Sequence, residues 1–173
     1  MDNSLKPNFV FFGTPEFAAK ILGKLVEAGF VPKAVVCNPD RPVGRKKIIT
    51  PPPVKVLAQK HNIKVLQPEK LEIGNCRLWR ASPLAGKLEI GEVAFAVVAA
   101  YSKIIPKKIL EIPKLGVIGV HPSLLPKYRG ASPIQSAILN GDEETGATLY
   151  LMDEKLDHGL ILAQRILNYE LRI

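Results

Sequence analysis

The 173-residue sequence contains few of the residues that build disulfide frameworks and metal sites. It has two cysteines, Cys37 and Cys76, which do not form a C-x-x-C motif, and three histidines. Neither a disulfide framework nor a zinc site is indicated, and no metal is predicted. We expect both thiols to be packing or surface residues.

Long apolar runs are also absent. No stretch approaches the roughly 18 apolar residues that span a bilayer. The first ten residues, MDNSLKPNFV, lack a basic segment followed by a long apolar one, so we expect neither an anchor nor a signal peptide, and a cytoplasmic protein. Because 47% of the residues are hydrophobic, the chain can still bury a core, and its length favours one domain.

Acidic residues are fewer than basic ones, which leaves a net charge of +8. This charge would favour a phosphate-rich partner, although a basic surface that serves only solubility explains it equally well. Part of the charge lies in the segment PDRPVGRKK, which carries Arg41, Arg45, Lys46 and Lys47, with Lys33 and Lys55 nearby. Pro42 and Gly44 predict that this segment is a loop without regular structure. Such a loop could close over a phosphate-bearing substrate, or it could be solvated surface.

Short apolar runs alternate with helical patterns along the chain. One run ends at Gly13, and Pro15 and Glu16 then suit the start of a helix. Further strands are expected over 33–38, 63–68, 93–101, 116–120, 147–152 and 160–171, with helices over 54–62, 105–113 and 132–140; no element is predicted for 69–92. Such alternation indicates a Rossmann-like α/β fold, with an open, mostly parallel sheet and helices on both faces. Gly13 alone does not make the three-glycine dinucleotide motif, so no nicotinamide or flavin is predicted.

His121 and Asp157 are the acid–base candidates. The apolar run 117–120 ends at His121, and Asp157 lies in the polar turn MDEKLDHG between two expected strands. A carboxylate that contacts an imidazole raises its basicity and fixes its orientation, so such a pair could move protons near neutral pH. The spacing alone leaves open that the two residues never meet.

Three motifs resemble the folate-dependent formyltransferases. SLLPKYRG is similar to the folate-site signature of that family, and the D-x-x-x-D-x-G turn that follows contains Asp157. The segments FFGTPEFAAKIL and NPDRPVGRKKIITPPPVKVLA resemble the methionyl-tRNA formyltransferases within it. The resemblance runs from Phe9 to Gln164, with the motifs in matching order and spacing, so it is specific.

This resemblance implies transfer of a formyl group from 10-formyltetrahydrofolate to the α-amino group of methionine on initiator tRNA. It implies that His121 and Asp157 assist proton movement, and that Phe17 contacts the methionyl side chain. The implied folate-binding residues are Ser123, Leu124, Leu125 and Pro126, together with Val98, Tyr101 and Ser102 at a neighbouring strand end. The implied tRNA-binding residues are Arg41, Arg45, Lys46 and Lys47.

Gly119 departs from the family pattern. The related enzymes have an asparagine two residues before the histidine, and its amide donates to the oxyanion of the tetrahedral intermediate. Glycine has no such donor, and loss of one oxyanion donor costs about 10²–10³ in rate. We therefore expect impaired catalysis. The alternative is that Gly119 only relieves crowding at the strand end.

The related tRNA enzymes continue into a β-rich C-terminal domain that binds tRNA. We expect residues 1–173 to be a C-terminally truncated catalytic domain without that domain, with tRNA binding weak or lost and association through an exposed edge possible. Two other functions stay open: a sugar-nucleotide N-formyltransferase, and a folate-binding module without catalysis.

Overall fold

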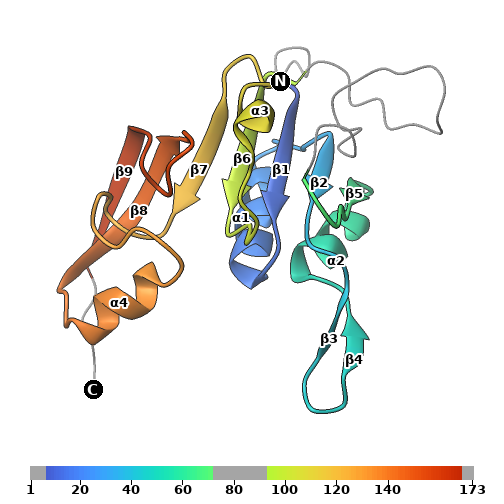
Figure 1. Cartoon of the computed structure of the whole chain (residues 1–173), viewed down its shortest axis with the longest axis horizontal. Coiled ribbons are helices and arrows are strands. Elements are labelled where there is room, and N and C mark those ends of the chain that lie inside the picture. The colour runs from blue at the N-terminus through green and yellow to red at the C-terminus, as the bar shows by residue number, and fades with distance from the viewer. Residues whose placement is uncertain (1–6, 72–92, 169–173) are drawn as a thin grey trace.

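A seven-stranded sheet forms the centre of the molecule (Figure 1). The computed structural model describes residues 7–71 and 93–168. The strands of this sheet are β1 (Phe9–Gly13), β2 (Ala34–Val36), β5 (Lys64–Leu66), β6 (Phe95–Ala99), β7 (Val117–His121), β8 (Glu144–Leu151) and β9 (Leu160–Asn168). Their order is β5-β2-β1-β6-β7-β8-β9. The first five pair parallel, and β8 and β9 are antiparallel. The Rossmann-like α/β fold predicted from the sequence is confirmed.

Helices cover both faces of the sheet. They are α1 (Glu16–Glu27), α2 (Pro53–Lys60), α3 (Lys107–Leu110) and α4 (Pro133–Leu139). Side chains alternate along β1, so Phe11 packs with Leu22 of α1 and Val54 of α2, while Phe12 packs with Ile109 of α3 on the other face. Among the described residues, no helix is long and apolar enough to cross a membrane.

The strand order creates a switch point between β1 and β6. After β1 the chain builds β2 and β5 on one side, and it then returns to build β6 and β7 on the other. Ligand crevices of open α/β sheets lie at the carboxyl ends of strands at such a point. Asn38 joins these ends, because its backbone N–H donates to Thr14 Oγ1 (3.3 Å) and its side-chain Nδ2 donates to Ser102 Oγ (2.7 Å).

The basic segment is a hairpin, so the prediction of a loop without regular structure is wrong. Strands β3 (Arg41–Val43) and β4 (Ile48–Thr50) pair antiparallel, and Figure 1 shows them extending away from the main sheet. Proline is tolerated in a strand that lies at an edge, as both strands of an isolated hairpin do. The turn is closed by Gly44 and Lys47, which have φ values of 71° and 49°.

An ion pair fixes the base of the hairpin. Lys55 Nζ donates to both carboxylate oxygens of Asp40 (2.8 and 2.7 Å) and to Gln67 Oε1 (2.9 Å). The hydrogen bond from Lys55, supported by one from Gln67, lowers the pKa of Asp40 below its usual value. Lys55 is therefore held in an ion pair at the base of the hairpin, whereas the cations on the hairpin itself are exposed.

Gly13 allows α1 to approach the end of β1. A Cβ atom at this position would lie 2.6 Å from Ala18 Cβ and 2.8 Å from the carbonyl oxygen of Ala99. One neighbour is a helix side chain and the other is strand backbone, and neither can move without shifting its element. Helix α1 can therefore begin close to the end of β1 because Gly13 has no side chain.

We expect Gly13→Ala to lower the free energy of unfolding by about 1–3 kcal/mol, the usual cost of overpacking a core. Urea denaturation measures the change. Gly23→Ala is the matched control, because a Cβ there would lie 3.6 Å from Leu57 Cδ2, an ordinary contact, and alanine favours a helix interior. Equal stability of Gly13→Ala and the parent chain would contradict this account of Gly13.

Strands β8 and β9 hold the SLLP loop that follows β7. The buried Thr148 Oγ1 donates to the carbonyl of Ser123 (2.6 Å) and accepts from the N–H of Leu125 (3.1 Å). Gln164 Nε2 on β9 donates to the Leu125 carbonyl (2.8 Å) and to Thr148 Oγ1 (3.0 Å). The Leu125–Pro126 peptide bond is cis. The backbone of this loop is therefore fixed by side chains of the sheet.

We expect Thr148→Val to destabilise the chain by about 1–3 kcal/mol, because valine keeps the volume but leaves the buried Leu125 N–H without its acceptor. Thr148→Ser is the control, since serine removes a methyl group and keeps the hydroxyl. Thermal unfolding of both variants separates the two effects. The assignment fails if valine is tolerated better than serine.

Candidate active site

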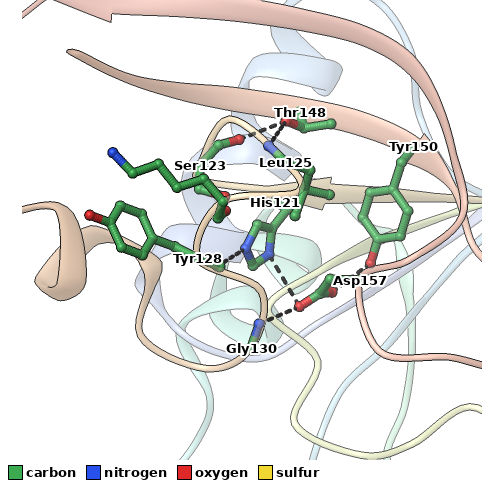
Figure 2. Close-up of polar contacts among 9 residues, drawn as sticks. His121, Ser123, Leu125, Tyr128, Gly130, Thr148, Tyr150 and Asp157 are labelled. Carbon is green, nitrogen blue, oxygen red and sulfur yellow. Dashed lines mark hydrogen bonds and ion pairs between the residues drawn. The ribbon is translucent and has the colours of Figure 1, made fainter.

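His121 is buried at the carboxyl end of β7, with 6% of its surface exposed. Its Nε2 lies 2.8 Å from the backbone carbonyl oxygen of Tyr128. A carbonyl can only accept, so Nε2 carries the proton of this hydrogen bond. Nδ1 faces the carboxylate of Asp157, with 3.6 Å between Nδ1 and Oδ2 (Figure 2). The fold thus brings together the two acid–base candidates, which the sequence left unconnected.

Two hydrogen-bond donors orient Asp157. Its Oδ1 accepts from the hydroxyl of Tyr150 and its Oδ2 from the backbone N–H of Gly130, each at 2.7 Å. The Asp157 backbone has a φ of 45°, a left-handed conformation that is uncommon for residues other than glycine but is better tolerated by aspartate. The carboxylate is therefore aimed at His121 by contacts from two separate segments.

Tyr150 fills the space beside Gly119. The two residues face each other across the β7–β8 pairing, and a Cβ at Gly119 would lie 2.3 Å from Tyr150 Cε1. This contact agrees with the interpretation that Gly119 relieves crowding. Tyr150 was not identified from the sequence, because a tyrosine inside an apolar strand is typical of a packing residue. The available signal was its hydroxyl, since a buried tyrosine usually has a hydrogen-bond partner.

The residues expected at the folate pocket lie on two neighbouring strand ends. After β7, Ser123 and Leu125 have buried side chains, Leu124 is half-buried and Pro126 is exposed. The Ser123 hydroxyl donates to the Lys127 carbonyl (2.6 Å), within the loop itself. The buried side chains of this set support the loop, which leaves Leu124 and Pro126 to face outward.

The second part of the expected folate pocket lies at the end of β6. Val98 is buried in the core within this strand, and Tyr101 packs edge-on against Phe12, with ring centroids 5.5 Å apart. Ser102 is exposed and accepts the hydrogen bond from Asn38. Tyr101 and Ser102 follow β6 and the SLLP loop follows β7, so the two parts lie at the ends of adjacent strands.

The residues expected to bind the aminoacyl-tRNA are more widely spread. Phe17 is half-buried in the first turn of α1, at the same carboxyl edge as His121. The four cations are exposed on the β3–β4 hairpin and are Arg41, Arg45, Lys46 and Lys47. The hairpin follows β2, so β1 and β6 separate it from β7 within the strand order (Figure 1).

Cys37 is the cysteine that lies within the described residues. Cys37 is buried, and burial raises the pKa of its thiol to about 11, as expected of a packing residue. Cys76 and most of segment 69–92 lie outside the described residues. Within the parts of the chain that the structure describes, no three or more histidine, cysteine, aspartate or glutamate residues form a group that could hold a metal ion.

Solved formyltransferase structures share this fold. Phosphoribosylglycinamide formyltransferase from Bacillus halodurans superimposes with a TM-score of 0.70 at 21% identity, over 96% of this chain and 82% of its own. The sugar 3N-formyltransferase WlaRD gives a TM-score of 0.62 at 18% identity, over 95% of this chain and 53% of its own. At such identities the likeness shows the fold alone.

Sequence comparison is more specific. Methionyl-tRNA formyltransferase from Enterococcus faecalis is 52% identical over 156 residues, which are 90% of this chain and 47% of that protein. The enzyme of the same name from Caldicellulosiruptor saccharolyticus is 51% identical over 164 residues, 94% of this chain and 50% of that protein. The chain thus spans about half the length of these curated relatives. The model of the family described as "Formyl transferase" matches residues 7–168, and the chain therefore belongs to the formyl transferase family.

Proposed function

We propose that this chain transfers a formyl group from 10-formyltetrahydrofolate to the α-amino group of methionine on initiator tRNA. The observation that carries the proposal is the pair formed by the buried His121 and the half-buried Asp157, held 3.6 Å apart at the carboxyl edge of the sheet. The names of relatives about 50% identical support methionyl-tRNA as the acceptor. Because the chain spans half their length, its activity, substrates and cytoplasmic location are all part of the proposal.

The proposed role of His121 and Asp157 is proton transfer. An amine that attacks the formyl carbon forms a new C–N bond and must lose a proton, while the bond from that carbon to the folate nitrogen breaks and the leaving nitrogen must gain a proton. A positioned histidine or carboxylate accelerates such proton transfer by about 10²–10⁴. Nε2 of His121 donates its proton to the Tyr128 carbonyl, so in the neutral ring Nδ1 has a free lone pair and is the nitrogen that can accept a proton. A proton on Nδ1 would give a positive ring beside the Asp157 carboxylate, which stabilises that charge.

An unpaired acceptor at the carboxyl edge of the sheet supports binding of a folate ligand. Asn38 Oδ1 is buried and has no hydrogen-bond partner among the described residues. An unsatisfied buried acceptor is costly, and a ligand donor that reaches it would satisfy it. The formyl donor supplies the carbon that is transferred; Leu124, Pro126, Ser102 and the backbone of the SLLP loop would hold it.

We expect the rate of formyl transfer to be lower than in relatives that have an oxyanion donor at the position of Gly119. No side chain at Gly119 can donate to an oxyanion, and loss of one such donor costs about 10²–10³ in rate. The magnitude stays a prediction, because Tyr150 fills the space in which a side chain at 119 would lie.

Formyl transfer from 10-formyltetrahydrofolate to methionyl initiator tRNA tests the proposed function. We expect slow but measurable transfer at high tRNA concentration, lowered at least about 10²-fold by His121→Asn through loss of the proton acceptor. His61→Asn is the matched control, since His61 is exposed at the end of α2. Equal rates for the two variants would sink the proposed role of His121.

Binding assays extend the test if no transfer is seen. Folate binding by an inert chain would favour a binding module, and transfer to an amino-sugar nucleotide would replace tRNA as the acceptor. Either result would contradict the proposed function, while leaving the family assignment in place.

For the hairpin we expect Arg45→Ala to weaken tRNA binding and to reduce the slope of log affinity against log salt by about one, because one phosphate contact is lost. The control is Lys20→Ala, which removes one positive charge from the exposed surface of α1. Filter binding at several salt concentrations gives both slopes. The hairpin has no part in tRNA binding if both variants keep the parent slope.

A further inference from the structure

Tyr150 and Gly119 occupy one space between β7 and β8. Besides the short approach to the ring, a Cβ at Gly119 would lie 2.8 Å from the Tyr150 hydroxyl oxygen. Even the smallest side chain at position 119 would therefore have to displace the tyrosine. In this position the tyrosine requires a glycine at 119, and the space is filled by a polar group as well as by an aromatic ring.

The Tyr150 hydroxyl has a specific partner. It donates to Asp157 Oδ1 at 2.7 Å, while Gly130 N–H donates to Oδ2, the oxygen that faces His121 (Figure 2). With a hydrogen bond to each oxygen, the carboxyl plane cannot rotate freely. Without the tyrosine donor, the bond from Gly130 to Oδ2 would be the one hydrogen bond from the described residues that orients the group.

The hydroxyl is suited to this task because it stays protonated. Tyr150 is 3% exposed, and burial, followed by the hydrogen bond to Asp157, raises the pKa of the phenol above its ordinary value. Its ordinary value is already about 10, so the group is a donor throughout the neutral range. Hydrogen bonds to ionised groups are roughly twice as strong as neutral ones.

We propose that Tyr150 is a positioning residue for the reaction, which holds the Asp157 carboxylate toward His121, and that Gly119 is required because it admits the tyrosine. This inference rests on the proposed function for the role of Asp157. It assigns Tyr150 no contact with substrate, so its effect passes through the orientation of Asp157.

Tyr150→Phe is the direct test, because phenylalanine keeps the ring and removes only the hydroxyl. We expect kcat to fall about 10- to 100-fold, as for loss of a hydrogen bond to a charged group, with KM for the formyl donor and for tRNA unchanged. Leu149→Val is the control, since it alters the adjacent but exposed side chain of β8. An unchanged kcat, or a change in KM alone, would overturn the inference.

Gly119→Ala tests the shared space. We expect this variant to lower both the melting temperature and kcat, because the added methyl group displaces Tyr150. Combining it with Tyr150→Leu should restore the melting temperature and leave kcat low, because the smaller side chain removes the clash without returning the donor. If Gly119→Ala alone matches the parent in both measurements, the coupling is refuted.

Crystal structures of the parent chain and of Tyr150→Phe separate this inference from the proposed function. A carboxylate that rotates away from His121 in Tyr150→Phe supports positioning by Tyr150, even if the parent chain shows no formyl transfer and the proposed function fails. A carboxylate that keeps its orientation overturns the inference, whatever the activity of the parent.

Discussion

The hydrogen bonds from β8 are the constraint on which the candidate site depends. Thr148 holds the backbone of the SLLP loop, and two residues along the same strand Tyr150 holds Asp157. Residues two apart on a strand point to the same face, so one buried face of β8 fixes both the loop and the carboxylate. His121 lies on the neighbouring strand, and its distance from Asp157 is therefore set by the β7–β8 pairing.

The sequence predicted the sheet and its helices because both have strong local signals. Continuous apolar runs gave the buried parallel strands, and helical spacing after Pro15 gave α1, which begins at Glu16. The β3–β4 hairpin was missed because its strands are short, fully exposed and contain Pro42. Such strands have no buried face, so no alternation of apolar and polar residues reveals them.

The site was predicted less completely, because its contacts join segments far apart in sequence. His121 was identifiable from its position at a strand end, whereas its contact with Asp157 depends on the path of β8 between them. Tyr128 and Asp157 have positive φ values without being glycine, and the residue type alone does not predict that conformation at either position. Backbone conformations of this kind collect at functional sites, where surrounding contacts maintain them. Here the contacts are the His121–Tyr128 hydrogen bond and the two donors to Asp157.

Gly119 illustrates why one position cannot be interpreted without its spatial neighbours. By itself Gly119 is a missing donor, yet the adjacent strand fills its space with a tyrosine whose hydroxyl donates to Asp157. An ionised carboxylate has about four lone-pair sites, and Tyr150 and Gly130 use one on each oxygen. Asp157 is thus oriented by the protein and still has acceptor capacity for His121 and for an incoming amine. A carboxylate held in this way retains the two properties that proton transfer requires, fixed direction and free acceptor sites.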